Sequence, residues 1–209
     1  MKTLIAVPAM DSVPSRFAQS LAMIRKVGDC ALTFQIGSLV YFSRNELAKK
    51  SIEMEADYIL WLDSDMFFEP DLLERMFKVL DENKLDFLSG LYFRRVPPFS
   101  PVVFDKLDIT DKGAEWTEFE ELPEGLFEVG GCGFGCVLMK TDIIFDVGCK
   151  FGDMFAPIGS VGEDLSFCWR ARECGYKLYC DPTITLGHVG QNVVDKKFYD
   201  SYRKVTQKG

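Results

Sequence analysis

Two carboxylates one residue apart, Asp63 and Asp65, directly follow an apolar, aromatic-rich segment of strand length at 56–62. At the carboxyl end of a buried parallel strand, such a pair lies in the crevice where open α/β sheets bind their ligands. Carboxylate oxygens suit a hard divalent cation that stays bound to substrate phosphates. Since D-x-D sequences also mark solvated turns, it is the hydrophobic strand before the pair that favours a metal site here.

A second acidic pair, Glu163 and Asp164, follows Gly162 at the start of a helical pattern that stops at Gly175. Acids in the first turn of a helix ordinarily cap it and interact with its dipole. The same helix terminus keeps a carboxylate ionised, which also suits a general base that takes a proton from a hydroxyl. The sequence leaves both interpretations open.

His188 is the only histidine of the chain, and it follows an apolar run at 183–186. A lone histidine is commonly a structural residue. Its position at a strand end, between Gly187 and Gly190, makes it a candidate third metal ligand as well.

The glycine-rich segment at 130–135 lies between two expected strands and opens no helix. It therefore does not fit a dinucleotide-binding fingerprint or a P-loop. We expect it either to let the backbone approach a ligand closely or to form a bulged hairpin.

The elements that must position these residues alternate through the first half of the chain. Strands are expected at 4–7, 31–36, 56–62 and 85–92, and helices at about 14–27, at 44–55 with Ser43 as the N-cap, and at 71–80. This alternation predicts a mostly parallel sheet with right-handed crossovers, as in nucleotide-binding folds. The second half of the chain has a different pattern, with prolines, a run of acids, and expected strands at 126–129 and 134–139. We expect an acceptor-binding region in this half.

Composition limits the classes of protein to consider. The 209 residues, 47% of them hydrophobic, suit one domain with a small appendage, and a net charge of -8 argues against broad binding to nucleic acid or an anionic membrane. Neither a transmembrane segment nor a signal peptide is recognisable, so we expect a cytoplasmic protein, in the host cytoplasm if a phage encodes it. The seven cysteines form no C-x-x-C pair, which predicts reduced thiols in the core.

The order of these motifs over residues 2–190 resembles the GT-A glycosyltransferases, most closely the family-two type. Segments 61–66 and 89–95 look particularly like those of its small stand-alone phage and bacterial members. The resemblance implies an α/β fold, namely a GT-A (Rossmann-like) three-layer sandwich with a mostly parallel central sheet and a small acceptor-side β region.

The resemblance also implies how the chain is divided. It places a single GT-A domain at 1–190, with a nucleotide-binding half at 1–95 and an acceptor and catalytic half at 96–190. Residues 191–209 then form a C-terminal tail or lid.

The resemblance assigns a role to each candidate residue. Asp63, Asp65 and His188 match ligands of Mn²⁺ or Mg²⁺, which faces the diphosphate of a nucleoside-diphosphate sugar, with a UDP-sugar favoured. Asp164 matches the acid that deprotonates the acceptor hydroxyl in inverting members, with Glu163 beside it. The residues matched to donor binding are Pro8, Arg44, Asp63, Asp65, Arg94 and Gly131.

The expected activity is that of an inverting hexosyl- or N-acetylhexosaminyltransferase. The alternatives are a retaining GT-A transferase, a sugar nucleotidyltransferase, and a non-catalytic module that binds sugar nucleotides. Segment 9–14 lacks the glycine-rich, basic loop expected of a nucleotidyltransferase. The acceptor, whether a glycan, a protein or a modified nucleobase, stays open, as does the oligomeric state.

Overall fold

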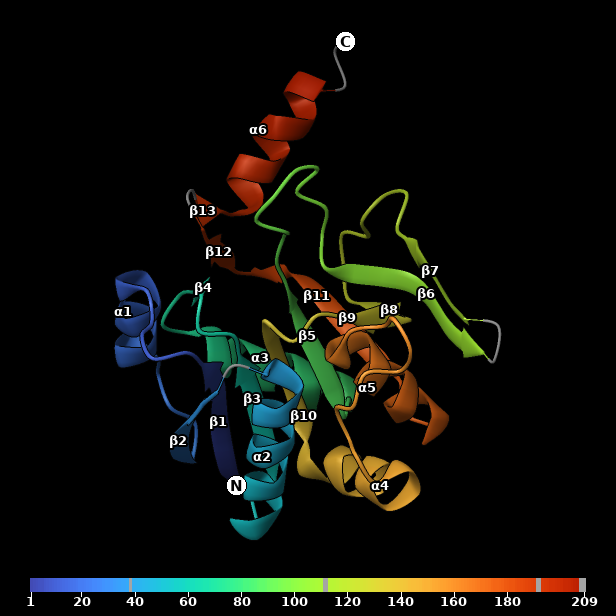
Figure 1. The fold of residues 1–209 in the computed structure, drawn as a ribbon. Coiled ribbons are helices and arrows are strands. Elements are labelled where there is room, and N and C mark those ends of the chain that lie inside the picture. Colours follow the sequence, from blue (N-terminus) through green and yellow to red (C-terminus); the bar gives the residue numbers. More distant parts are fainter. Residues whose placement is uncertain (38, 111–112, 191–192, 207–209) are drawn as a thin grey trace.

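The computed structural model describes residues 1–37, 39–110, 113–190 and 193–206 (Figure 1). Its elements in chain order are β1 (Lys2–Ala9), α1 (Ser15–Met23), β2 (Asp29–Ile36), α2 (Val40–Glu53), β3 (Tyr58–Leu62), β4 (Met66–Phe67), α3 (Leu72–Asn83), β5 (Phe87–Leu91), β6 (Val103–Thr110), β7 (Gly113–Glu118), β8 (Phe127–Val129), β9 (Gly131–Cys132), β10 (Cys136–Lys140), α4 (Thr141–Phe151), α5 (Glu163–Glu173), β11 (Leu178–Thr185), β12 (Gly187–Val189), β13 (Val193–Val194) and α6 (Lys196–Thr206).

The central sheet has the strand order β2-β1-β3-β10-β5-β11-β8. Strands β1, β2, β3 and β5 run parallel, as the alternating pattern predicted, and β11 runs parallel to β5, whereas β8 and β10 run antiparallel to their neighbours. The insertion of β10 between β3 and β5 was not predicted. The Asp63 N–H donates to the Gly135 carbonyl at 3.2 Å, so β10 starts beside the carboxyl end of β3 and must run back along it.

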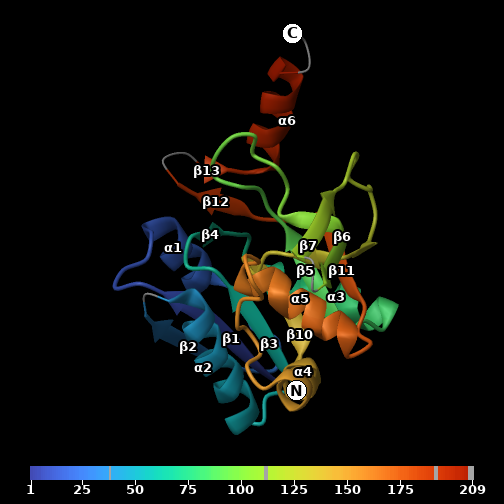
Figure 2. The same cartoon turned by 45° about the vertical axis from the view of Figure 1, so that its right-hand side comes forward.

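Helices cover both faces of this sheet, which confirms the predicted three-layer arrangement. Helices α2, α4 and α5 lie on the near side of the sheet in Figure 2, and α1 and α3 pack on the opposite face. Leu4 and Ala6 of β1 face the first core, whereas Ile5 and Val7 face the second. Since side chains alternate along a strand, a strand covered on both faces is apolar throughout.

The first three helices have other boundaries than the sequence-based expectation, and α3 continues to Asn83, past its expected end at 80. Helix α1 ends at Met23, short of the predicted end near 27, because Ile24 already has an extended backbone. Helix α2 begins at Val40, so Ser43 is a buried residue inside the helix and does not cap it. The apolar residue Leu39 occupies the N-cap position, a choice that capping rules disfavour.

Two three-stranded sheets flank the central one, with the orders β13-β12-β4 and β7-β6-β9. Helix α6 follows β13 and stands away from the central sheet (Figure 1). All seven cysteines are free thiols, as predicted, but only four of them lie in the core, because Cys149 is exposed and Cys30 and Cys174 are half-buried. Within the part of the chain that the structure describes, no helix combines the length and the apolar character needed to cross a membrane.

Candidate active site

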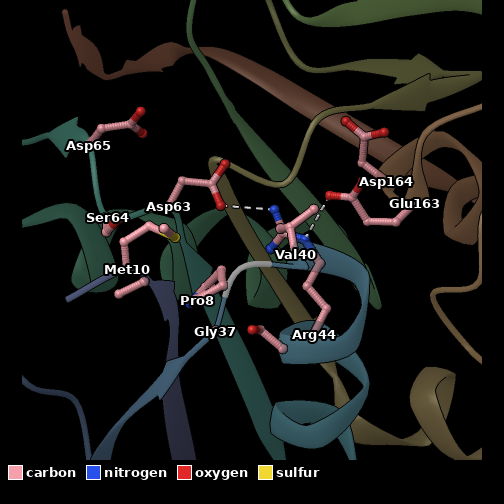
Figure 3. A pocket seen from close by; sticks show the side chains of 12 residues that line it. Pro8, Met10, Gly37, Val40, Arg44, Asp63, Ser64, Asp65, Glu163 and Asp164 are labelled. Atoms are coloured by element: carbon pink, nitrogen blue, oxygen red, sulfur yellow. Dashed lines mark hydrogen bonds and ion pairs between the residues drawn. The ribbon is translucent and has the colours of Figure 1, made fainter.

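The candidate site is a cavity of about 260 Å³ at the carboxyl ends of β1 and β3 (Figure 3). Its lining comes from the end of β1, the start of α2, the turn after β3 and the start of α5: Pro8, Ala9, Met10, Gly37, Val40, Ser43, Arg44, Asp63, Ser64, Asp65, Glu163 and Asp164. A position outside the carboxyl ends of parallel strands is where open α/β sheets bind ligands. Both acidic pairs singled out in the sequence therefore face one space.

Arg44 joins these two acidic pairs. Its Nη2 donates to Asp63 Oδ1 at 2.8 Å and its Nε donates to Glu163 Oε1 at 3.2 Å, although Glu163 lies 119 residues further along the chain. The guanidinium is 2% exposed, and its Cζ lies 5.6 and 5.3 Å from the ring centres of Trp61 and Phe134. Burial lowers the pKa of Arg44, but the two carboxylates raise it more, so the pKa ends above its ordinary value.

His188 reaches the D-x-D turn from β12. Its Nε2 lies 3.3 Å from Asp65 Oδ2, and its Nδ1 lies 2.8 Å from the carbonyl oxygen of Phe93. Because a carbonyl oxygen only accepts, Nδ1 must carry the hydrogen, which leaves Nε2 facing Asp65. Burial raises the pKa of Asp65, yet His188 and Arg95 outweigh burial and hold that pKa below its ordinary value.

Asp164 has the electrostatics of a proton acceptor. Burial raises its pKa first and the negative charge of Glu163 raises it further, whereas the Leu165 N–H, which donates to Oδ1 at 2.7 Å, and Arg44 lower it. The pKa that results is about 6. A carboxylate with a pKa near 6 is ionised at neutral pH and is a stronger base than an ordinary aspartate.

Two buried polar atoms in the residues that line the cavity have no hydrogen-bond partner within the described part of the chain. They are the Ser43 hydroxyl and the Arg44 Nη1. Buried polar groups are nearly always satisfied, so an unpaired hydroxyl and an unpaired N–H at one cavity need an explanation. Both atoms are inaccessible to solvent, so a ligand in the cavity reaches them only if neighbouring groups move.

Most of the predicted site residues meet as expected. Pro8, Arg44, Asp63, Asp65, Glu163 and Asp164 all line the cavity, and His188 contacts it through Asp65.

Two predicted donor-binding residues do not line this cavity. Arg94 pairs with Glu118 at 3.7 Å, and it is Arg95 whose Nη1 lies 2.9 Å from Asp65 Oδ2. Alternate residues of an extended segment point to opposite sides, and the sequence does not reveal which of two adjacent arginines faces the carboxylate. Gly131 is buried against the Leu107 and Leu165 side chains, where a Cβ would come within 3.0 Å of each.

The glycine-rich segment accommodates Tyr92, a residue that the sequence-based reasoning missed. A Cβ on Gly133 would lie 2.0 Å from the Tyr92 hydroxyl, and a Cβ on Gly135 would lie 2.7 Å from its Cζ. The Gly135 N–H donates to this hydroxyl at 3.1 Å, and the Tyr92 ring meets the His188 ring edge to face. The close approach predicted for these glycines is therefore made by the protein's own ring, which supports His188. Two glycines two residues apart in an apolar segment were the available signal.

The three predicted metal ligands are not gathered around one point. Asp63 turns to Arg44 and Asp65 turns to His188 and Arg95. Among the described residues, no set of three or more His, Cys, Asp or Glu side chains is arranged to hold a metal ion. Of the three predicted ligands, only Asp65 and His188 are in direct contact.

Comparison with known proteins agrees with this geometry. The family model described as "Glycosyl transferase family 2" matches residues 44–147, which include the D-x-D turn. No match was found among curated protein sequences.

Solved structures share the fold. The crystal structure of A197 from STIV is similar with a TM-score of 0.65 and 20% identity, over 93% of this chain and 94% of that one. The crystal structure of GalNAc-T7 with UDP, GalNAc and Mn2+ is similar with a TM-score of 0.60 and 9% identity. That match covers 90% of this chain but only 43% of GalNAc-T7. Together, the family match over residues 44–147 and the shared fold support a family-two-like glycosyltransferase with a GT-A fold.

Proposed function

We propose that the protein transfers a hexosyl or N-acetylhexosaminyl group from a nucleoside-diphosphate sugar to an acceptor hydroxyl, with inversion and with Asp164 as the base. The observation that carries this proposal is the single cavity that Asp63, Asp65 and Asp164 line together. One end of that cavity provides groups for a diphosphate, and the other provides a carboxylate with a raised pKa.

The donor nucleotide would lie over the end of β1 and the start of α2. Pro8 and Ala9 provide an apolar wall there, and Ser43 and Arg44 line the cavity beside it. Arg95, beside Asp65, is placed to contact a phosphate. We favour a UDP-sugar, and the similar GalNAc-T7 structure contains UDP.

The residues around Asp65 fit a divalent cation, Mn²⁺ or Mg²⁺. Asp65 is ionised because its pKa is lowered, and the Nδ1 contact of His188 with Phe93 leaves Nε2 as the ligand nitrogen. Asp65 and His188 would hold the ion, with Asp63 beside them. Such ions bind through one or two protein carboxylates and complete their coordination with water and substrate phosphates, so two protein ligands are sufficient. When bound, the cation supplies charge neutralisation for the departing nucleoside diphosphate.

The residues of the chain itself account for the transfer step. Asp164 accepts the proton of the acceptor hydroxyl while that oxygen forms its bond to the anomeric carbon. The bond from the anomeric carbon to the phosphate oxygen breaks on the opposite face, and its electron pair leaves with the nucleoside diphosphate. Arg44 forms ion pairs with Asp63 and Glu163, and Asp65 forms one with Arg95. Among the described residues, Asp164 has no ion-pair partner, so its carboxylate is left to accept the proton.

The reaction's stereochemistry and an Asp164→Asn variant test this proposal. We expect the product linkage, assigned by NMR, to be inverted relative to the donor, and transfer by the variant to fall by about 10²–10⁴-fold. Asp142→Asn is the matched control, since Asp142 is an exposed acid in the first turn of α4. A retained linkage, or equal losses in the two variants, would contradict Asp164 as the base.

A further inference from the structure

A second cavity, of about 390 Å³, lies between α6 and two neighbouring segments of the chain at 98–101 and 118–122. We call it the α6 groove. The residues that give it its character are Pro98, Glu118, Phe119, Glu120, Tyr199 and Tyr202. It shares no lining residue with the candidate active site.

The α6 groove combines flat rings with hydrogen-bonding groups. Three aromatic side chains, Phe119, Tyr199 and Tyr202, line it and are only partly buried. Glu118 and Glu120 are exposed at its edge and accept hydrogen bonds from hydroxyl groups. A pyranose ring presents an apolar C–H face and a rim of hydroxyls, so this pairing of rings and carboxylates matches the surface of a sugar.

The rings of the groove are held in place by the body of the protein. Tyr199 stacks on the buried Phe93 with ring centres 4.3 Å apart, and Tyr202 meets Phe99 edge to face at 4.9 Å. Side chains that are ordered before a ligand arrives lose less entropy on binding. The groove is therefore a preformed surface, and α6 contributes to it although the helix stands away from the sheet (Figure 1).

One chain segment links the α6 groove to the candidate active site. Arg95 contacts Asp65 of the active site, and Pro98, three residues later, lines the groove. Three residues span at most roughly 11 Å, so the backbone of Pro98 lies within that distance of the backbone of Arg95, whose side chain reaches the D-x-D turn. On the same segment Arg94 pairs with Glu118 of the groove, and the carbonyl of Phe93 holds His188.

We propose that the α6 groove binds sugar units of an oligosaccharide acceptor next to the unit that receives the transferred sugar. This proposal rests on the proposed function and narrows the acceptor to a glycan. The lining of the groove includes the carboxylates of Glu118 and Glu120 and the guanidinium of Arg203, and Arg94 pairs with Glu118. These charges balance, so the groove holds no excess of positive charge for phosphorylated or uronic acid units, which favours neutral or amino sugars.

Binding of immobilised oligosaccharides by the whole labelled protein tests the proposal without any turnover. The probes are neutral, amino-sugar and uronic-acid oligosaccharides, with acidic and basic peptides on the same surface. We expect neutral or amino-sugar probes to bind. Tyr202→Ala should weaken that binding at least about tenfold, which corresponds to roughly 1.4 kcal/mol.

Glu120→Gln and Glu121→Gln form a matched pair for this test. Both remove one charge from adjacent exposed positions, but only Glu120 lines the α6 groove. We expect the Glu120 variant to bind the glycan several-fold more weakly and the Glu121 variant to bind like wild type. Tyr202→Phe keeps the ring that packs on Phe99 and should bind like wild type. Limited proteolysis within α6 that is no faster in Tyr202→Ala than in wild type checks that the loss does not arise from release of α6.

Metal-dependent hydrolysis of the sugar nucleotide, measured in parallel, separates the two proposals. If donor hydrolysis is normal but glycan binding is absent, or equal in all variants, the proposal that the α6 groove binds an acceptor glycan is overturned. The proposed function would then still stand. Binding of peptides only would also overturn it. Absence of donor hydrolysis together with groove-dependent glycan binding would contradict the proposed function instead.

Discussion

Asp164→Asn should abolish most of the transfer and at the same time stabilise the protein near pH 8. The pKa of Asp164 is about 6 in the folded protein, against an ordinary value of 3.8. The folded state therefore holds the proton of this group more tightly than the unfolded state does. Ionising the group above pH 6 costs stability, whereas asparagine keeps an acceptor for the Leu165 N–H and carries no charge.

The size of this gain follows from the shift in pKa. A shift of about two units corresponds to roughly 3 kcal/mol. Partial exposure of Asp164 and its place at the N-terminus of α5 both reduce the cost of its charge. We therefore expect the variant to be about 1–2 kcal/mol more stable than wild type near pH 8.

The sign of the pH dependence can be checked directly. Wild type should lose stability relative to the variant as pH rises through the interval between the two pKa values, because the folded state binds more protons there. The difference should vanish below that interval and level off above it. Urea unfolding of both proteins at several pH values measures this difference, with Asp142→Asn as the control.

A variant that is no more stable than wild type near pH 8 would refute the argument. So would a stability difference that does not change with pH. Either result would mean that the burial of Asp164 and the charge of Glu163 do not raise its pKa, and the electrostatic argument for a base at this position would fail.

Three further predictions concern other parts of the site. Arg44→Ala leaves the carboxylates of Asp63 and Glu163 without their cation. Because both acids are partly exposed, we expect urea unfolding to show that the free energy of unfolding falls by about 2–4 kcal/mol. A fall well under about 1 kcal/mol would contradict a structural role for the ion pairs. The transfer rate at low donor concentration should fall about tenfold per pH unit below about pH 6, because Asp164 takes up a proton there. A transfer rate that stays constant from about pH 5 to 7 would argue against Asp164 as the base. His188→Ala should raise the Mn²⁺ concentration for half-maximal donor hydrolysis at least about tenfold, and an unchanged metal titration would remove His188 from the site.

The sequence predicted the elements that hold the site because their patterns are local. The apolar run before Asp63 and the G-E-D start of α5 depend on neighbours in the chain, and both were confirmed. A strand at 134–139 was predicted, but its antiparallel insertion between β3 and β5 as β10 was missed, since that pairing is a contact over long sequence distance. Propensity and pattern carry little information about such pairings.

The details of the site depend on contacts that no sequence pattern encodes. Arg44 was expected at the donor site, but its position between Asp63 and Glu163 became visible only in the fold. Arg94 was predicted at the donor site, but Arg95 is the arginine that contacts Asp65. This error has the same origin, since neighbouring residues of an extended segment face opposite sides. The predicted tail at 191–209 lies partly outside the described residues, and its described part contains β13 and α6.

The central claim is that the cavity at Asp63, Asp65 and Asp164 processes a nucleoside-diphosphate sugar with the help of a divalent cation. The most direct measurement is hydrolysis of a panel of UDP- and GDP-sugars by wild type and Asp65→Ala, with and without Mn²⁺, followed by release of the nucleoside diphosphate. We expect at least one donor to be hydrolysed by wild type only when Mn²⁺ is present, and Asp65→Ala to lose that hydrolysis. Absence of metal-dependent turnover across the whole panel, or equal turnover in the variant, would contradict the account.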